Sequence, residues 1–316
     1  MKEEKRYRAG VLGTCCIPWR ADYSLAEDVF RQSVRHLICH GIRDLYIFGT
    51  AGEGYAVTER QFDEIARVFL EETRGVGVQG MVGLISLSLP TIIDRIERVR
   101  GMGGRRFQLT LPGWGALRDA EVETFFRETC GRFPDCEFLH YNLMRTGRIL
   151  TGAEYGRLAA RHGNLVATKN STTDEARLKS LLSEAPQLQH FITEAGFAKA
   201  SAMGECGFLI SLASMNLALG RDYFRAGRTG DSERLGAMSR ELGELLRELL
   251  ELVGGRAHMD GAFDKIFCRM HDPNFPLRLL PPYEAVGEEI FERFVALVRA
   301  RYPHWLPGGD AGAATE

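Results

Sequence analysis

Lysine and excess charge are both scarce in this chain. Only six of the 40 basic residues are lysines, and the formal net charge at pH 7 is −2. A nearly neutral chain has no general attraction to nucleic acid or to anionic membranes, so neither is expected as a partner. No run of about 18 apolar residues occurs, so no membrane-spanning helix is expected. The charged N-terminus, Met1–Arg6, lacks the apolar core of a secretory signal, which indicates a cytoplasmic protein.

Metal-binding and disulfide patterns are also missing. The seven cysteines are odd in number and contain no C-x-x-C pair, so reduced thiols are expected rather than a disulfide framework or a zinc site. His36 and His40 stand four residues apart, but no glutamate follows His36, so the helical zinc-protease motif is absent. We therefore expect no resident metal and interpret the two histidines as helix-surface residues.

Short apolar runs alternate with longer amphipathic segments along the chain. Thr58–Thr73 has apolar residues at helical spacing and opens with Thr58 and Gln61 in a capping box. Thr151–Arg161 and Asp174–Ser183 show similar helical patterns. The short runs predict eight strands: Ala9–Ile17, Asp44–Gly49, Val76–Leu84, Arg106–Leu111, Cys136–Asn142, Leu165–Asn170, His190–Glu194 and Phe208–Leu212.

Eight strands that alternate with helices predict an α/β fold, a closed (β/α)8 barrel of the TIM type. A doubly wound open sheet is the main alternative, but no G-x-G-x-x-G turn follows the first strand. After Leu212 the strand signals stop and helical segments follow: Met215–Ala226, Ser232–Val253, Met259–Met270 and Tyr283–Arg301. We expect a barrel over residues 8–225, a C-terminal helical extension over 226–303 and a disordered tail over 304–316.

Lys169 is the one lysine that directly follows a buried-strand pattern, Leu165–Thr168. Loss of hydration at such a place lowers the pKa of an ammonium group, and a neutral amine beside a cleft can form an imine with a carbonyl substrate. On this segment alone, a structural lysine that reaches water or pairs with a carboxylate is the commoner interpretation. The neighbouring strand ends decide between the two, because catalytic groups of a barrel gather at the C-terminal ends of its strands.

Two other strand ends carry suitable chemistry. The second strand ends in Gly49-Thr50-Ala51-Gly52-Glu53-Gly54, a glycine-rich turn whose N–H groups can hold an anion such as a carboxylate. The fifth ends in His140-Tyr141-Asn142, and the phenol of Tyr141 can pass a proton. Each feature alone is explained at least as well by an ordinary turn or a half-buried tyrosine. Their joint placement with Lys169 favours a catalytic site.

In these motifs the sequence resembles the dihydrodipicolinate synthase and N-acetylneuraminate lyase family of pyruvate-dependent class I aldolases. Residues 49–53 match the family's G-[ST]-[TS]-G-E turn, Tyr141-Asn142 matches its Y-N motif, and Lys169 matches its K-[DEN]-[STA] lysine. The similarity extends from about Gly10 to Arg301 and includes the helical C-terminal part.

The resemblance implies a mechanism and a set of residues. Lys169 would form an imine with pyruvate or another 2-oxo acid, Tyr141 would shuttle protons, and Thr50 would orient Tyr141. The N–H groups of Thr50 and Ala51 would hold the carboxylate of the 2-oxo acid. The other substrate-binding positions that we expect are Gly49, Gly52, Trp114, Arg145 and Ile210. The resemblance implies no metal and no dissociable cofactor, and it implies a homotetramer or homodimer.

The sequence departs from the family where the second substrate binds. Ala51 replaces the second hydroxyl residue of the turn, and Pro112-Gly113-Trp114 stands where the synthases have a P-Y-Y segment that lends a tyrosine across a subunit interface. Met144 stands near the position where a proline is common, and Arg145 is one residue out of register with the arginine that binds the second substrate's carboxylate. Trp114 and Met144 predict an apolar pocket for an aromatic or hydrophobic partner, an aldehyde, rather than strict dihydrodipicolinate synthase activity.

The sequence thus predicts a lyase, an aldolase or hydro-lyase, that acts on a 2-oxo acid through Lys169. Both outcomes share one imine, so both stay open. One alternative is a family member that has lost catalysis and binds a 2-oxo acid as a sensor or scaffold, against which Thr50, Tyr141 and Lys169 argue together. Another is a barrel enzyme with pyridoxal phosphate on Lys169, but the segments Glu194–Gly196 and Gly204–Gly207 carry carboxylates and no clear phosphate cradle.

Overall fold

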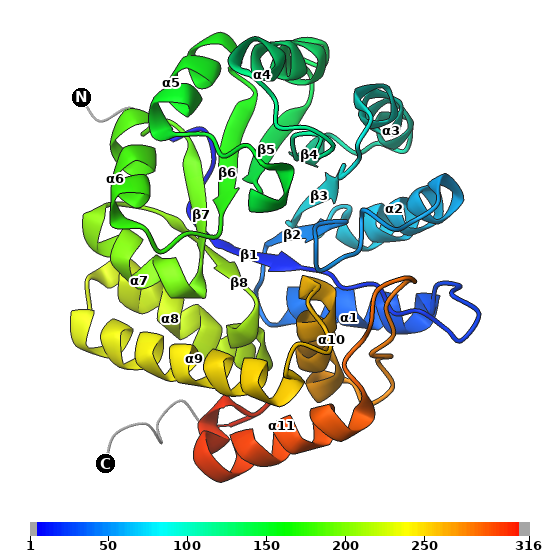
Figure 1. The fold of residues 1–316 in the computed structure, drawn as a ribbon, viewed down its shortest axis with the longest axis vertical. Helices are drawn as coiled ribbons and strands as arrows, with labels where there is room; N and C mark the ends of the chain where they lie inside the picture. The colour runs from blue at the N-terminus through cyan, green and yellow to red at the C-terminus, as the bar shows by residue number, and fades with distance from the viewer. Residues whose placement is uncertain (1–4, 310–316) are drawn as a thin grey trace.

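The eight predicted strands form a closed parallel barrel in the computed structural model, which describes residues 5–309 (Figure 1). Each strand pairs with the next along the chain, and the eighth pairs with the first. The strands are β1 (Val11–Thr14), β2 (Asp44–Ile47), β3 (Gln79–Gly83), β4 (Arg106–Leu109), β5 (Glu137–Asn142), β6 (Leu165–Asn170), β7 (Gln189–Thr193) and β8 (Gly207–Ile210). Closure confirms the barrel and excludes the doubly wound open sheet.

Most strands are shorter than the apolar runs that predicted them. The run Ala9–Ile17 yields only the four residues of β1, although the three residues that follow β1 are fully buried. Cys16, in that loop, packs against Ala51 and Phe275, and Phe275 lies in the C-terminal extension. The loop is therefore apolar because the extension covers it, and apolar character alone does not mark where a strand ends.

A ring of helices covers the outside of the barrel (Figure 1). The predicted capping box is confirmed, since Thr58 Oγ1 accepts a hydrogen bond of 3.2 Å from the N–H of Gln61 at the start of α2. The ring consists of α1 (Glu27–Cys39), α2 (Glu59–Thr73), α3 (Leu89–Gly101), α4 (Asp119–Phe126) with the π-helical turn η1 (Arg127–Gly131), α5 (Gly152–Arg161), α6 (Glu175–Glu184), α7 (Glu194–Met203) and α8 (Leu217–Thr229). Short 3-10 segments, η2 (Met144–Thr146) and η3 (Leu212–Asn216), follow β5 and β8.

Two apolar layers hold the barrel together. The larger cluster fills the space between strands and helices and includes Leu45, Ile47 and Phe107. A smaller cluster, which includes Tyr46 and Phe191, fills the inside of the barrel. Residues 45 to 47 thus alternate between the two layers, as the pleat of a strand requires.

The C-terminal extension consists of α9 (Ser232–Val253), α10 (Asp260–His271) and α11 (Glu288–Arg301), followed by the 3-10 turn η4 (Pro303–Trp305). Figure 1 shows α9 along α7 and α8, and α10 between α1 and α9 with one end toward the barrel opening. Helix α11 begins five residues later than predicted because the backbone at Gly287 is still extended. No helix among residues 5–309 is long and apolar enough to cross a membrane.

The predicted disordered tail is wrong for its first residues. Trp305 is fully buried, and Asn216 Nδ2 donates to the carbonyl oxygens of His304, Leu306 and Gly309 at 2.9 to 3.1 Å. These bonds fix residues 304–309 against the start of α8. The rest of the predicted tail, residues 310–316, lies outside the described part of the chain.

Candidate active site

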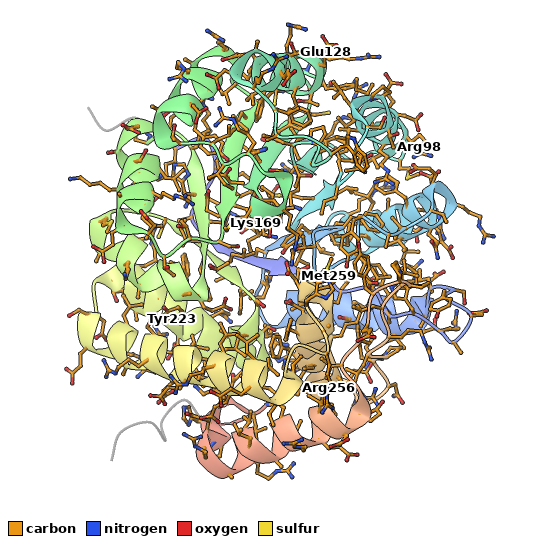
Figure 2. All side chains as sticks on the ribbon, in the orientation of Figure 1. Arg98, Glu128, Lys169, Tyr223, Arg256 and Met259 are labelled. Atoms are coloured by element: carbon orange, nitrogen blue, oxygen red, sulfur yellow. The ribbon has the colours of Figure 1, made fainter. Side chains whose placement is uncertain are left out.

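Lys169 lies on β6 inside the barrel, where its side chain is almost completely buried (Figure 2). Its Nζ donates a hydrogen bond of 2.9 Å to the hydroxyl of Tyr46 and lies 3.8 Å from the ring centroid of Tyr141. Burial lowers the pKa of Lys169 to about 8, although the negative charges of Asp260 and Asp264 act in the opposite direction. The amine therefore has an accessible neutral form near physiological pH, which attack on a carbonyl carbon requires.

Tyr141 stands beside the lysine because β5 and β6 are paired in register at these two residues. Burial, and next the charge of Asp260, raise the pKa of Tyr141 to about 12, while the hydroxyls of Thr50 and Ser171 act to lower it. The phenol is protonated at neutral pH and can donate its proton to an oxygen atom on a lysine-bound substrate.

The glycine-rich turn after β2 presents backbone N–H groups to the same place. Within residues 5–309 the N–H groups of Thr50 and Ala51 donate to no protein acceptor, and both residues line the cavity that contains Lys169. The glycines act through close packing, since a Cβ at Gly52 would lie 2.8 Å from the backbone nitrogen of Phe48. The left-handed residues are Phe48 and Glu53, with φ values of 58° and 54°. Two free N–H groups beside an amine suit a carboxylate.

The cavity around Lys169 has a volume of about 450 Å³ and opens at the C-terminal ends of the strands. It contains five of the residues predicted from the sequence: Lys169, Tyr141, Thr50, Ala51 and Ile210. The walls also carry hydroxyl and carboxyl groups that the sequence did not single out, from Tyr46, Ser171, Thr193, Glu194, Ser211, Ser239, Asp260 and Asp264. The volume suits a small organic acid with a short polar substituent.

The other predicted site residues lie around this cavity rather than in its wall. Gly49 packs against Tyr46, where a Cβ would lie 2.6 Å from the tyrosine ring, and Gly52 supports the turn. Arg145 lies in a neighbouring cavity of about 440 Å³ that shares Thr50 with the first, and its Nη2 donates to Asp260 Oδ1 at 3.0 Å. The arginine is thus neutralised by a carboxylate of the same chain.

Trp114 and Met144 do not form the apolar wall that the sequence predicts for a second substrate. The side chain of Trp114 is 89% exposed and that of Met144 is 67% exposed, and neither lines the cavity around Lys169. That wall combines hydroxyls and carboxylates with apolar side chains, among them Leu209, Leu212, Leu242 and Leu246. The hypothesis of an aromatic or hydrophobic partner therefore lacks the contacts that motivated it.

Among the wall residues that the sequence analysis missed, Tyr46, Asp260 and Asp264 act directly on Lys169. Tyr46 stands in a predicted strand, and strand alternation puts it on the opposite face from Leu45 and Ile47, which lie in the outer layer. Asp260 and Asp264 stand one turn apart on α10, whose first turn reaches the barrel opening near Met259 (Figure 2). No local pattern marks these two aspartates, because only the path of the chain after residue 226 brings them to Lys169.

The end of β8 does not offer a phosphate cradle. Glu194 Oε1 accepts hydrogen bonds from the N–H groups of Ser211 at 2.5 Å and Ala213 at 3.2 Å. Barrel enzymes commonly bind phosphate with N–H groups at this position, and here a carboxylate occupies them. These residues therefore do not fit pyridoxal phosphate. Within residues 5–309 no group of three or more His, Cys, Asp or Glu side chains is arranged to hold a metal ion.

Known proteins resemble this chain along most of its length. A sequence model of the dihydrodipicolinate synthetase family matches residues 8–257. An uncharacterized DapA-like lyase of Pyrococcus abyssi is 20% identical over 297 residues, which cover 92% of this chain and 97% of that protein. The 4-hydroxy-tetrahydrodipicolinate synthase of Pelodictyon phaeoclathratiforme is 23% identical over 247 residues, or 77% of this chain and 82% of that enzyme.

Solved structures show the same fold. YagE, a prophage protein of the dihydrodipicolinic acid synthase family from E. coli K12, solved in complex with pyruvate, superposes with a TM-score of 0.80 at 18% identity, covering 92% of this chain and 98% of YagE. Proteus mirabilis N-acetylneuraminate lyase gives a TM-score of 0.80 at 17% identity, covering 93% and 98% of the two chains. At these identities the structural likeness establishes the barrel and its helical extension.

Proposed function

We propose, since this chain belongs to the dihydrodipicolinate synthetase family, that it is a class I lyase whose Lys169 forms an imine with pyruvate or a related 2-oxo acid. One observation carries the proposal. The buried Nζ of Lys169, with a pKa lowered to about 8, lies 3.8 Å from the ring of Tyr141 in a cavity that also presents two free backbone N–H groups. This arrangement supplies an amine nucleophile, a proton donor and an anion site at one place.

Each residue has a definite part in imine formation. The N–H groups of Thr50 and Ala51 hold the substrate carboxylate, which places the adjacent ketone carbon next to the Lys169 amine. The amine attacks this carbon, the ketone oxygen takes a proton from Tyr141, and water leaves as the C=N bond forms. Tyr46 keeps the amine aimed at the cavity through its hydrogen bond. No step calls for a metal or a dissociable cofactor.

The imine serves both an aldolase and a hydro-lyase. It withdraws electrons from C3, so a C3–C4 bond can break or form, or a hydroxyl on C4 can leave. An aldehyde is the partner in the first case and water is the product in the second. The polar groups in the wall around Lys169, among them Ser211, Ser239 and Asp264, suit a substrate that carries hydroxyl groups beyond C3. A cytoplasmic location and a homotetramer or homodimer are further parts of the proposal, and they rest on the family resemblance.

Borohydride trapping tests the proposal directly. The protein is incubated with pyruvate and borohydride, and its intact mass is measured. Wild type is expected to gain the mass of one reduced pyruvate adduct, and Lys169→Ala is expected to gain none. Lys179→Ala, on the exposed face of α6, is the matched control and is expected to react like wild type. If wild type forms no adduct with pyruvate or with a panel of 2-oxo acids, the sensor or scaffold alternative replaces the enzyme.

A further inference from the structure

Asp264 lies in the wall of the Lys169 cavity without a cationic partner. Its side chain is buried, and its Oδ1 accepts a hydrogen bond of 3.0 Å from the hydroxyl of Ser211. Within residues 5–309 no basic side chain lies within ion-pair distance of Asp264, whereas Asp260, one turn earlier on α10, pairs with Arg145 and accepts a hydrogen bond from Thr50. Two carboxyl groups of one helix thus face one cavity in different environments.

These environments separate the protonation states of the two groups. Burial raises the pKa of Asp264 to about 7, and the charges of Asp260 and Glu194 add to this effect, while the Ser211 hydroxyl and Lys169 act to lower it. Burial also acts to raise the pKa of Asp260, but the hydrogen bonds from Arg145 and Thr50 outweigh it and hold that pKa below its usual range. A pair of carboxyl groups separated in this way commonly divides acid–base roles in enzymes.

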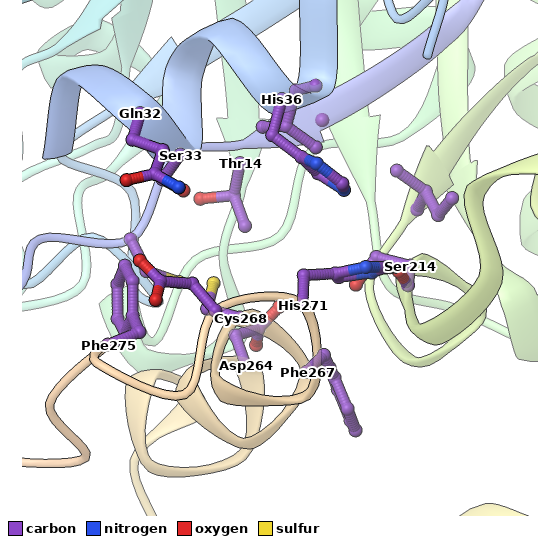
Figure 3. A pocket seen from close by; sticks show the side chains of 15 residues that line it. Thr14, Gln32, Ser33, His36, Ser214, Asp264, Phe267, Cys268, His271 and Phe275 are labelled. Atoms are coloured by element: carbon purple, nitrogen blue, oxygen red, sulfur yellow. Dashed lines mark hydrogen bonds between the residues drawn. The ribbon is translucent and has the colours of Figure 1, made fainter. Parts of the chain in front are cut away.

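A second, smaller cavity lies behind Asp264, between α1 and α10 (Figure 3). We call it the rear chamber; its volume is about 60 Å³, enough for a few water molecules. Thr14 Oγ1 and His36 Nε2 border it, and both are buried polar atoms without a hydrogen-bond partner in the described chain. His271 also borders the chamber, and its Nε2 donates a hydrogen bond of 2.6 Å to the carbonyl oxygen of Ser214. Asp264 thus lines both the rear chamber and the cavity around Lys169, and Ile210 is the other residue that lines both.

We propose that Asp264 is an acid–base residue that exchanges a proton with the oxygen atom on C4 of the lysine-bound substrate, and that the rear chamber returns this proton to solvent. The inference rests on the proposed imine chemistry of Lys169. It assigns to α10 a catalytic group distinct from Tyr141, which acts at the ketone oxygen. The ligand is a 2-oxo acid that carries a hydroxyl on C4.

The proton transfer balances in both reactions. In cleavage, ionised Asp264 accepts the proton of the C4 hydroxyl, and the C4–O bond becomes a carbonyl. The electron pair of the C3–C4 bond forms a C2–C3 double bond, and the π pair of the C=N bond moves to nitrogen. In dehydration, the enamine has already formed by transfer of a C3 proton to the Tyr141 phenolate, which is left when Tyr141 gives its own proton to the ketone oxygen. Its electron pair then forms the C3–C4 double bond, the C4–O bond breaks, and the neutral Asp264 carboxyl gives its proton to the departing oxygen, which leaves as water.

The proposal gives the two reactions pH profiles of opposite sign. Cleavage needs ionised Asp264, so its rate falls below about pH 7, and dehydration needs the neutral acid, so its rate falls above about pH 7. The other titratable groups that line the two cavities with Asp264 come from six elements and two flanking loops: Lys169 on β6, Tyr46 on β2, Tyr141 on β5, Glu194 on α7, His36 on α1, and Asp260, Cys268 and His271 on α10, with Cys16 in the loop after β1 and Asp272 after α10. Asp264 is identified as the titrating group only if the pH profile of turnover changes when Asp264 itself is replaced.

The test compares Asp264→Asn with wild type and with Asp94→Asn, a control with the same chemical change at an exposed position of α3. The probes are pyruvate, for trapping with borohydride, and 4-hydroxy-2-oxobutanoate, for turnover. Asp264→Asn is expected to trap pyruvate as fully as wild type and to turn over the hydroxy acid about 10²–10⁴-fold more slowly. It is also expected to lose the limb of the turnover profile near pH 7.

Four outcomes are informative beyond the expected one. Turnover by Asp264→Asn at the wild-type rate overturns the proposal, and so does a joint loss of trapping and turnover, which indicates a structural role. A wild-type protein that traps the hydroxy acid and neither cleaves nor dehydrates it overturns the proposal as well. A wild-type protein that traps no 2-oxo acid removes the proposed function itself, and this result is visible before any variant is made.

Discussion

Glu53 and Lys265 form a buried ion pair that ties the glycine-rich turn after β2 to α10. Lys265 Nζ lies 2.5 Å from Glu53 Oε1, and the two side chains are at most 1% exposed. The Glu53 carboxylate also accepts hydrogen bonds from Trp19 Nε1 at 2.8 Å and from the N–H of Leu280 at 2.6 Å. The acid of the G-T-A-G-E turn therefore positions the helix that carries Asp260 and Asp264, and it does not face the substrate cavity.

Replacing Glu53 with glutamine is expected to lower the free energy of unfolding by about 3–5 kcal/mol, because Lys265 is then left as an unpaired buried charge. Urea unfolding measures the change. Glu121→Gln, which removes the acid of the exposed Arg118–Glu121 pair, is the control and is expected to change the same quantity far less, because water screens that pair. An effect of Glu53→Gln no larger than that of the control would show that the pair does not anchor α10.

Lys169 is expected to destabilise the fold at neutral pH. Its pKa is 10.5 in an unfolded chain and about 8 in the folded protein, so the unfolded state binds more protons between these values and stability rises with pH across that window. Below about pH 8 the folded state carries the full penalty, on the order of 3 kcal/mol. Lys169→Met is therefore expected to be more stable than wild type at pH 7 by about 1–3 kcal/mol, since methionine also fills the space of the lysine stem.

Urea unfolding of Lys169→Met and wild type from pH 6 to pH 10 measures this difference. The gain in stability is expected to be constant below about pH 8 and to shrink as the pH rises from there toward 10, because folded Lys169 is then neutral while the unfolded chain still holds its proton. Lys179→Met, at an exposed position, provides the control and is expected to show no such trend. A gain that does not depend on pH would contradict a lowered pKa at Lys169.

The barrel and the residues of the proposed imine site were predictable because they depend on local patterns. Alternating strand and helix signals determine the order of elements, and the C-terminal ends of parallel strands must meet at one opening. Lys169 and Tyr141, each at such an end, were therefore expected to meet, and their strands are in fact paired at these two residues. The prediction that Lys169 and Tyr141 meet depends on the register between their adjacent strands.

The rest of the site was not predictable because it depends on chain segments that meet only in the folded protein. Asp260 and Asp264 are about 90 residues from Lys169 along the chain, and nothing in the sequence of α10 states which way the helix points. The prediction that Trp114 lines a second-substrate pocket was wrong for a different reason. Its position after β4 was predicted, but the direction of its side chain depends on the loop, where no strand pairing constrains it.

Asp260→Asn is expected to lower the pKa of Lys169 further, since the charge of Asp260 acts to raise that pKa in wild type. The rate of imine formation with pyruvate rises with the neutral fraction of the amine, so its midpoint on a pH profile is expected to move below about pH 8. The midpoint is measured by following imine formation at a series of pH values, with borohydride added at set times to trap the imine. Asp94→Asn, on the outer surface, is expected to leave the midpoint unchanged. An unchanged midpoint in Asp260→Asn would show that the charge of Asp260 does not affect the pKa of Lys169.

Trp114 is the most exposed of the large apolar side chains, at 89%, and Met144 and Leu87 follow at 67% and 64%. The three residues lie in the loops after β4, β5 and β3, at one end of three neighbouring strands. An exposed tryptophan in such a setting commonly anchors an interface, so we expect it to contribute to a homo-oligomer of this 35.3 kDa chain.

Light scattering after size exclusion is expected to give a multiple of that mass for wild type and a smaller multiple for Trp114→Ala. Leu250→Ala, which truncates a 49% exposed side chain on α9, controls for loss of apolar surface and is expected to keep the wild-type mass. A Trp114→Ala protein of unchanged mass would show that Trp114 does not anchor an interface between copies of the chain.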